Sequence, residues 1–284
     1  MKQKLIFLDI DGTLTEPGCN VPPDSALRAI RAAQANGHRV FLCTGRSYGM
    51  LQPLLQYGFD GAVGGAGGYV FCGDKVLFDC PMTPEQTRTA MEALARGRVL
   101  RTIEARDAAF GDEDLSAFLS GGSDRQNSEL VRWRRMLKDN FCIRPMREYD
   151  GRPIYKVIVM CQREAQLTEA RRLLEQDFRF CMQGTDAFGC LNGELINRKF
   201  DKGRGILRIC EYLHADPADT IGFGDSMNDL EMTQTVGVSV CMANGSEELK
   251  RRCSRVCPAV GEDGLAREFA ALGLTGAKAD GAGA

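Results

Sequence analysis

Three short apolar segments that run directly into polar residues constrain the fold of this chain more than any other feature. They are residues 5–8 (LIFL), 39–43 (RVFLC) and 220–224 (TIGFG). Continuous apolar runs of this length are typical of strands buried on both faces, as in parallel sheets covered by helices. Helical patterns separate the segments along the chain. We therefore expect an α/β fold with a Rossmann-like parallel sheet.

Turn residues add detail to the N-terminal part of this expectation. The Pro-Pro pair at 22–23 precedes a helical pattern, which we expect Asp24 or Ser25 to cap and the Asn-Gly pair at 36–37 to end. Two strand-like runs within 69–78 are separated by a turn that contains Gly73. We expect these runs to form a hairpin that leaves the sheet.

The composition changes near residue 82, where an arginine-rich stretch begins. This stretch contains a strong strand pattern at 154–160, a helical pattern at 163–176 and a loop-like polar run at 120–124. It is therefore interpreted as a separate insert of α+β character. The expected organisation is a core made of 1–81 and 191–284, an α+β insert at 82–190, and a disordered tail at 275–284.

Charge and hydropathy exclude several classes of partner. The chain has 36 Lys and Arg against 38 Asp and Glu, so no global field attracts nucleic acid or anionic membranes. The cationic run 131–135 around Trp133 is interpreted as an amphipathic helix rather than a nucleic-acid patch. No apolar stretch is long enough to span a membrane, and the N-terminal apolar run stops at Asp9, too early for a signal peptide. We expect a soluble, cytoplasmic protein.

Histidine and cysteine usage narrows the chemistry. The chain has two histidines, His38 and His214, both interpreted as structural, which excludes multi-histidine metal sites. Its 12 cysteines include no C-x-x-C pair, and we interpret them as reduced, mostly buried side chains without disulfides. Carboxylates are therefore the plentiful reactive groups.

Several of these carboxylates follow the expected strands directly. Asp9 and Asp11 follow the first strand, Thr44 follows the second, and Asp225 follows a later one. Lys202 is expected at the start of a helix. Because ligands of open α/β sheets bind at the carboxyl ends of the strands, we expect these side chains to converge.

Four ordered motifs resemble those of the haloacid dehalogenase superfamily of phosphohydrolases. They are Asp9-Ile10-Asp11-Gly12-Thr13-Leu14, Cys43-Thr44-Gly45-Arg46, Lys202-Gly203 and Gly224-Asp225-Ser226-Met227-Asn228-Asp229-Leu230-Glu231-Met232. The last motif, with Met242-Ala243-Asn244 and Glu262-Asp263-Gly264, is most similar to the Cof-like class IIB branch. That branch inserts its cap between the second and third motifs, where the 82–190 insert falls.

The resemblance implies an enzyme that transfers a phosphoryl group to a carboxylate. Asp9 would be the nucleophile that forms an aspartyl-phosphate, and Asp11 would protonate the leaving oxygen and then activate water. Thr44 would donate a hydrogen bond to the phosphoryl group, and Lys202 would neutralise its charge and keep Asp9 ionised. The implied cap closes over the site, excludes bulk water and contacts the leaving group.

The implied cofactor is Mg²⁺, because phosphate esters repel anionic nucleophiles unless a cation screens both. Its expected ligands are Asp9, Asp11 through the backbone carbonyl, and Asp225. Asp229 is either a further ligand or an orienting group, and we favour the orienting role. The expected contacts of the substrate phosphate are Thr44, Gly45, Arg46, Lys202 and Asn228.

Two features leave the substrate undefined. Residues 64–68 (GGAGG) stand where relatives usually carry an Asn-Gly pair, so a side-chain contact is missing or supplied elsewhere. Lys156, within the strand pattern of the cap, either faces solvent or reaches the substrate. Both interpretations remain open at this point.

The sequence therefore favours a Mg²⁺-dependent phosphatase that acts on a small phosphorylated metabolite, with sugar phosphates as the leading class. The expected state is a monomer or small homo-oligomer, without nucleic-acid or membrane partners. A phosphosugar mutase would use the same motifs. A non-catalytic regulatory protein on a phosphatase core is a further alternative, although such a protein should have lost at least one catalytic acid.

Overall fold

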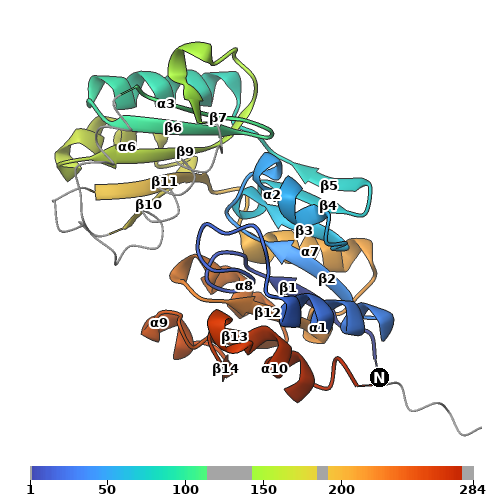
Figure 1. Ribbon diagram of the computed structural model, residues 1–284. Helices are drawn as coiled ribbons and strands as arrows, with labels where there is room; N and C mark the ends of the chain where they lie inside the picture. Colours follow the sequence, from blue (N-terminus) through green and yellow to red (C-terminus); the bar gives the residue numbers. More distant parts are fainter. Residues whose placement is uncertain (1, 114–142, 184–190, 277–284) are drawn as a thin grey trace, which may run out of the picture. The chain divides into compact units, whose positions relative to one another are not determined.

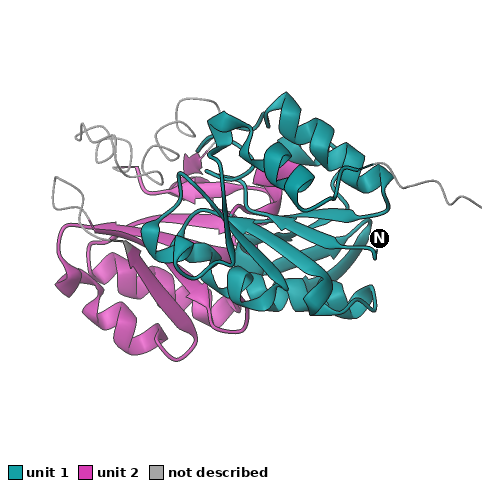
Figure 2. Ribbon diagram, turned by 90° about the horizontal axis from the view of Figure 1, so that it is seen from below, with its two compact units in different colours: residues 1–45, 53–78, 202–284 teal, residues 46–52, 79–201 magenta. Residues whose placement is uncertain are grey.

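The computed structural model describes residues 2–113, 143–183 and 191–276 (Figure 1). Its contacts divide the chain into two compact units, coloured separately in Figure 2: residues 1–45, 53–78 and 202–284 form the first, and residues 46–52 and 79–201 the second. The loop expected at 120–124, the run around Trp133 and residues 277–284 of the expected tail lie outside the described residues.

An eight-stranded sheet with the order β14-β13-β12-β1-β2-β3-β4-β5 forms the centre of the first unit. Its strands are β1 (Leu5–Leu8), β2 (Arg39–Cys43), β3 (Gly61–Gly64), β4 (Tyr69–Cys72), β5 (Lys75–Asp79), β12 (Thr220–Gly224), β13 (Val238–Met242) and β14 (Arg255–Cys257). All strands from β14 to β3 run parallel. The expected α/β fold with a Rossmann-like parallel sheet is confirmed.

The hairpin expected to leave this sheet stays in it. Strand β4 pairs antiparallel with β3 from Gly61 opposite Cys72 to Gly64 opposite Tyr69, and β5 continues the sheet beyond β4. The expectation was wrong because the exposed edge of β3 has backbone N–H and C=O groups that need partners, and the next segment supplies them.

Helices cover both faces of the parallel sheet. The helices that follow its strands are α1 (Asp24–Ala35), α2 (Tyr48–Leu55), α7 (Lys202–Tyr212), α8 (Leu230–Thr235), α9 (Glu247–Lys250) and α10 (Gly264–Ala271). Residues of α7 and α8 pack with Phe7 and Phe41, whose rings stack at a centroid distance of 5.2 Å. On the opposite face, Phe269 of α10 contacts Phe223 of β12.

Helix α1 ends as the sequence predicts but begins differently. Asn36 is its C-terminal cap, and Gly37 follows with a φ of 88°. The residue at the N-terminal cap is Pro23, which has no side-chain acceptor, so the expected capping by Asp24 or Ser25 is wrong. Asp24 lies in the first turn instead, where its charge complements the helix dipole. The Ser25 hydroxyl donates to Asp263.

The second unit contains a six-stranded sheet with the order β10-β11-β9-β6-β7-β8. Its elements are α3 (Pro84–Arg96), β6 (Leu100–Ala105), β7 (Ala109–Gly111), β8 (Ile143–Pro145), β9 (Ile154–Cys161), α6 (Thr168–Leu174), β10 (Phe178–Gln183) and β11 (Leu191–Asn197). Neighbouring strands run antiparallel except β7 and β8. Apolar residues of α3 and α6 pack on one face of this sheet.

The boundary expected at residue 191 is wrong for residues 191–201. Strand β11 pairs with β9 and β10 in the six-stranded sheet, so this segment belongs to the second unit. The apolar pattern of β11 resembles that of a core strand, and the sequence does not identify its partners. Short 3₁₀ helices complete the structure at Gly65–Gly67, Met146–Glu148, Glu164–Leu167, Pro217–Asp219, Met227–Asp229 and Val260–Glu262.

Candidate active site

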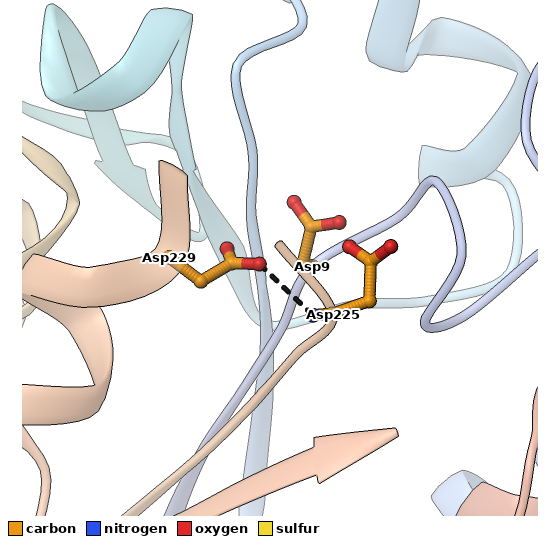
Figure 3. A group of neighbouring side chains, drawn as sticks. All are labelled: Asp9, Asp225 and Asp229. Carbon is orange, nitrogen blue, oxygen red and sulfur yellow. Dashed lines mark hydrogen bonds between the residues drawn. The ribbon is translucent and has the colours of Figure 1, made fainter. Parts of the chain in front are cut away.

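The carboxyl ends of β1, β2 and β12 lie side by side in the first unit. Leu8 is paired with Phe223 of β12 and with Leu42 of β2, so Asp9, Thr44 and Asp225 follow three neighbouring strands at the same edge of the sheet. The backbone N–H of Asp9 still bonds to the Phe223 carbonyl at 2.9 Å, and the chain then leaves the sheet. Figure 3 shows the carboxylates that gather there.

Lys202, the first residue of α7, joins two of these carboxylates. Its Nζ lies 2.7 Å from Oδ1 of Asp9 and 2.5 Å from Oδ1 of Asp229. All three side chains are buried, with at most 7% of any of them exposed. Burial alone would lower the pKa of Lys202, but the carboxylates of Asp229 and Asp9 outweigh it and hold that pKa well above its ordinary value. The Lys202 side chain therefore stays positively charged.

Both oxygens of Asp229 are occupied by donors from the protein. Oδ1 accepts from Lys202. Oδ2 accepts from the backbone N–H group of Asp225 at 3.0 Å, the bond drawn in Figure 3, and from that of Ser226 at 3.2 Å. A Cβ on Gly224 would lie 2.6 Å from Cγ of Asp229, so only glycine leaves room for this arrangement. These contacts hold the turn that presents Asp225, which favours the orienting role for Asp229.

The chemistry of this cluster fits a divalent cation with a preference for oxygen ligands. Oxygen atoms of Asp9, Asp225 and Asp229 lie within 4.8 Å of one another. Burial, only partly offset by Lys202, raises the pKa of Asp9 to about 7, and burial together with the charges of Asp9 and Asp229 raises that of Asp225 to about 9. One lysine does not balance three carboxylates, of which Asp9 and Asp229 are buried and Asp225 is half-buried, and a hard cation of the Mg²⁺ type would.

The turn after Asp9 is fixed by a glycine and an asparagine. Gly12 has a φ of 84°, and a Cβ there would lie 2.5 Å from Oδ2 of Asp225. Nδ2 of Asn244 donates to the Gly12 carbonyl at 2.8 Å, which ties the loop after β13 to this turn. Sequence reasoning assigned no role to Asn244, although its place after an apolar strand was the available signal. The Asp11 carboxylate accepts from the Gly18 N–H at 2.7 Å.

The glycine-rich run at 64–68 lies directly against Thr44. The Thr44 N–H donates to the Val63 carbonyl at 2.8 Å, and its own carbonyl accepts from the Ala66 N–H at 2.9 Å. Gly65, Ala66 and Gly67 all have positive φ. The run is therefore a tight left-handed turn that supports the backbone of Thr44.

The remaining predicted phosphate contacts are Gly45, Arg46 and Asn228. Gly45 ends a segment of the first unit, whereas Arg46, which is buried, begins a segment of the second unit. Asn228 is exposed, and its Oδ1 accepts from the Ser226 hydroxyl at 3.0 Å. His38 accepts from the Lys4 N–H, and His214 lies after α7 with a φ of 52°, so both have the structural surroundings expected of them.

Comparison with known proteins identifies similar chains over almost the whole length. A family model described as haloacid dehalogenase-like hydrolase matches residues 6–269. The chain is 28% identical over 275 residues to the putative phosphatase YkrA of Bacillus subtilis, covering 96% of this chain and 99% of that protein. It is 25% identical over 254 residues to a phosphoglycolate phosphatase of Metallosphaera sedula, covering 88% and 90% of the two chains.

Solved structures show the same fold. A hypothetical protein from Geobacillus kaustophilus matches with a TM-score of 0.77 at 26% identity, covering 96% of this chain and all of that one. A sugar phosphatase of haloacid dehalogenase subclass IIB matches with a TM-score of 0.71 at 21% identity, covering 96% of this chain and 100% of that one. Among the described residues, no helix combines the length and apolar character that a membrane span requires.

Proposed function

We propose that this chain, which belongs to the haloacid dehalogenase-like hydrolases, is a Mg²⁺-dependent phosphatase of small phosphorylated metabolites. The observation that carries the proposal is the buried Asp9 carboxylate, held by Lys202 beside Asp225 at the edge of the parallel sheet. The names of its relatives, which are phosphatases, support the reaction class. Sugar phosphates are our favoured substrates.

The cation would be held by Asp9, Asp225 and the Asp11 backbone carbonyl. It would supply positive charge that reduces the repulsion between the nucleophile and the phosphate oxygens. The protein supplies the rest of the positive charge through Lys202. Because its Nζ bonds to Asp9, the lysine opposes the rise that burial causes in the pKa of this carboxyl, and it orients the group. The Thr44 hydroxyl, at the end of the adjacent strand, would donate to an oxygen of the phosphoryl group.

The reaction would proceed in two displacements at phosphorus. An oxygen of Asp9 forms a bond to phosphorus while the bond to the alcohol oxygen breaks, and the Asp11 carboxyl gives its proton to that oxygen. The resulting Asp11 carboxylate then takes a proton from water, whose oxygen attacks phosphorus. The bond between Asp9 and phosphorus breaks, which releases inorganic phosphate and restores both carboxyl groups.

The hydrogen bond from Gly18 to Asp11 supports this assignment, because it fixes the carboxylate at the turn beside Asp9. We assign the selection of substrate to the second unit, which lies between the second and third motifs in the chain. A mutase would return the phosphoryl group to a sugar, and the release of inorganic phosphate separates the two reactions. Among the described residues no cysteines form a disulfide, which supports a reducing compartment such as the cytoplasm.

The test is the variant Asp9→Asn, assayed with an activated phosphate ester and Mg²⁺. We expect at least about a thousandfold loss of phosphate release, because an amide cannot replace the carboxylate as nucleophile. Asp24→Asn is the matched control, since Asp24 is exposed on α1, and it should retain wild-type turnover. A folded Asp9→Asn protein with near-normal turnover would refute the assignment of the nucleophile.

A further inference from the structure

The loop after β13 contacts both turns that carry the proposed ligands of the cation. Nδ2 of Asn244 donates to the Gly12 carbonyl at 2.8 Å. Two residues later, the Ser246 N–H donates to the Asp225 carbonyl at 2.7 Å. One short loop of the first unit therefore restrains the distance between the turn after Asp11 and the turn that presents Asp225.

Gly12 needs such a restraint because a glycine adopts positive and negative φ with similar ease. Its φ is 84°, and it has no side chain whose packing could fix the turn. The Gly12 N–H donates to the Thr15 carbonyl at 2.8 Å, and the Gly12 carbonyl accepts from Asn244. The peptide groups on both sides of the Gly12 Cα are thus held, and the first of these groups contains the Asp11 carbonyl.

The asparagine amide is itself oriented by a segment near the C-terminal end of the sheet. Its Oδ1 accepts from the Val260 N–H at 3.3 Å, so the amide uses its acceptor on one segment and its donor on another. Val260 is buried. The N–H groups of Glu262 and Gly264 both donate to the Ala259 carbonyl, which closes the turn around Val260. The amide therefore has one orientation that satisfies both bonds, with Nδ2 toward Gly12.

We propose that Asn244 is a positioning residue for the cation, because it directs the Asp11 backbone carbonyl and holds it at a constant distance from Asp225. This inference rests on the cation site in the proposed function. Asn244 acts through the Gly12 peptide and not by contact with the cation or the substrate. It also gives a role to two motifs that the proposed reaction does not use, Met242-Ala243-Asn244 and Glu262-Asp263-Gly264.

The test compares Asn244→Ala with the wild type by calorimetric titration of Mg²⁺ into protein without substrate. We expect the dissociation constant for Mg²⁺ to rise about tenfold, because the Asp11 carbonyl is no longer held in place for the cation. Release of phosphate from nitrophenyl phosphate should fall to a similar extent at low Mg²⁺. Saturating Mg²⁺ should restore that turnover to within about threefold of the wild type, since the groups that react are unchanged.

Asn36→Ala is the matched control, because Nδ2 of Asn36, in the turn before β2, also donates to a backbone carbonyl, that of Leu274 at 2.9 Å. It should lower the thermal midpoint in chelator about as much as Asn244→Ala and leave the Mg²⁺ constant unchanged. An unchanged Mg²⁺ constant in folded Asn244→Ala would overturn the inference, because the amide would then stabilise the fold alone. If the wild type released no phosphate while Asn244→Ala still bound Mg²⁺ more weakly, the proposed function would fail and the role of Asn244 would stand.

Discussion

At the scale of single residues, the site depends on one lysine between two buried carboxylates. Nζ of Lys202 bonds to both Asp9 and Asp229. Ion pairs at this depth do not simply add stability, because the desolvation of each charge opposes the attraction between them. Removing one member leaves the others unpaired, and that is the costly change.

We therefore expect Lys202→Met to lower the free energy of unfolding by about 3–5 kcal/mol, the usual cost of an uncompensated buried charge. Adding Asp229→Asn to this variant should restore part of the loss, because one of the two unpaired charges is removed. Urea denaturation measures both changes. Lys199→Met, at an exposed lysine, is the control and should leave stability nearly unchanged. Additive effects of Lys202→Met and Asp229→Asn would contradict the coupling.

A second prediction at this scale concerns Gly12. Its φ of 84° strains any other residue, and a Cβ would in addition collide with Oδ2 of Asp225. Gly12→Ala should cost about 1–3 kcal/mol of stability and reduce phosphatase turnover, because the Asp225 carboxylate must move. Gly58 separates the backbone strain from the collision, since it has a φ of 80° but no atom within 4 Å of the place where a Cβ would lie.

The control Gly58→Ala should therefore cost only about 1 kcal/mol and leave turnover unchanged. Thermal melts and steady-state assays of the two variants give the comparison. If Gly12→Ala and Gly58→Ala lost the same stability and neither lost activity, the close contact between Gly12 and Asp225 would not be needed for turnover.

At the scale of helices and strands, local sequence patterns predicted the features that depend on residues adjacent in the chain. The apolar runs of β1, β2 and β12 and the polar residues that follow them could be identified without a structure, because burial on both faces leaves a continuous apolar signature. The end of α1 at Asn36 could be identified for a similar reason, since the left-handed residue after a helix favours glycine.

Features that depend on spatial partners could not be predicted in the same way. The apolar pattern of β11 is compatible with either sheet, and only its pairing with β9 and β10 assigns residues 191–201 to the second unit. The roles of Asn244 and the glycine-rich turn beside Thr44 likewise depend on contacts between loops. Lys156 is an intermediate case, because its charge was visible in the sequence and its two glutamate partners were not.

At the scale of the whole molecule, the buried carboxylates link folding stability to pH and to the cation. In the metal-free protein the pKa of Asp9 rises from 3.8 to about 7 and that of Asp225 from 3.8 to about 9, mainly through burial. The folded state then keeps protons that the unfolded chain has already lost. Stability should therefore fall as pH rises between about 4 and 9, the interval between the unfolded and folded pKa values.

A cation that binds the ionised carboxylates reverses this trend, because its binding releases the retained protons and grows stronger as pH rises. We expect Mg²⁺ to raise the thermal midpoint by several degrees near pH 9 and by less near pH 6, relative to protein in chelator. Asp225→Asn removes the group with the higher pKa, so the variant should lose most of the Mg²⁺ effect and the decline of the metal-free protein above about pH 7. A Mg²⁺ shift that is equal at both pH values would mean that the cation binds without displacing protons from Asp9 and Asp225, which would contradict their assignment as its ligands.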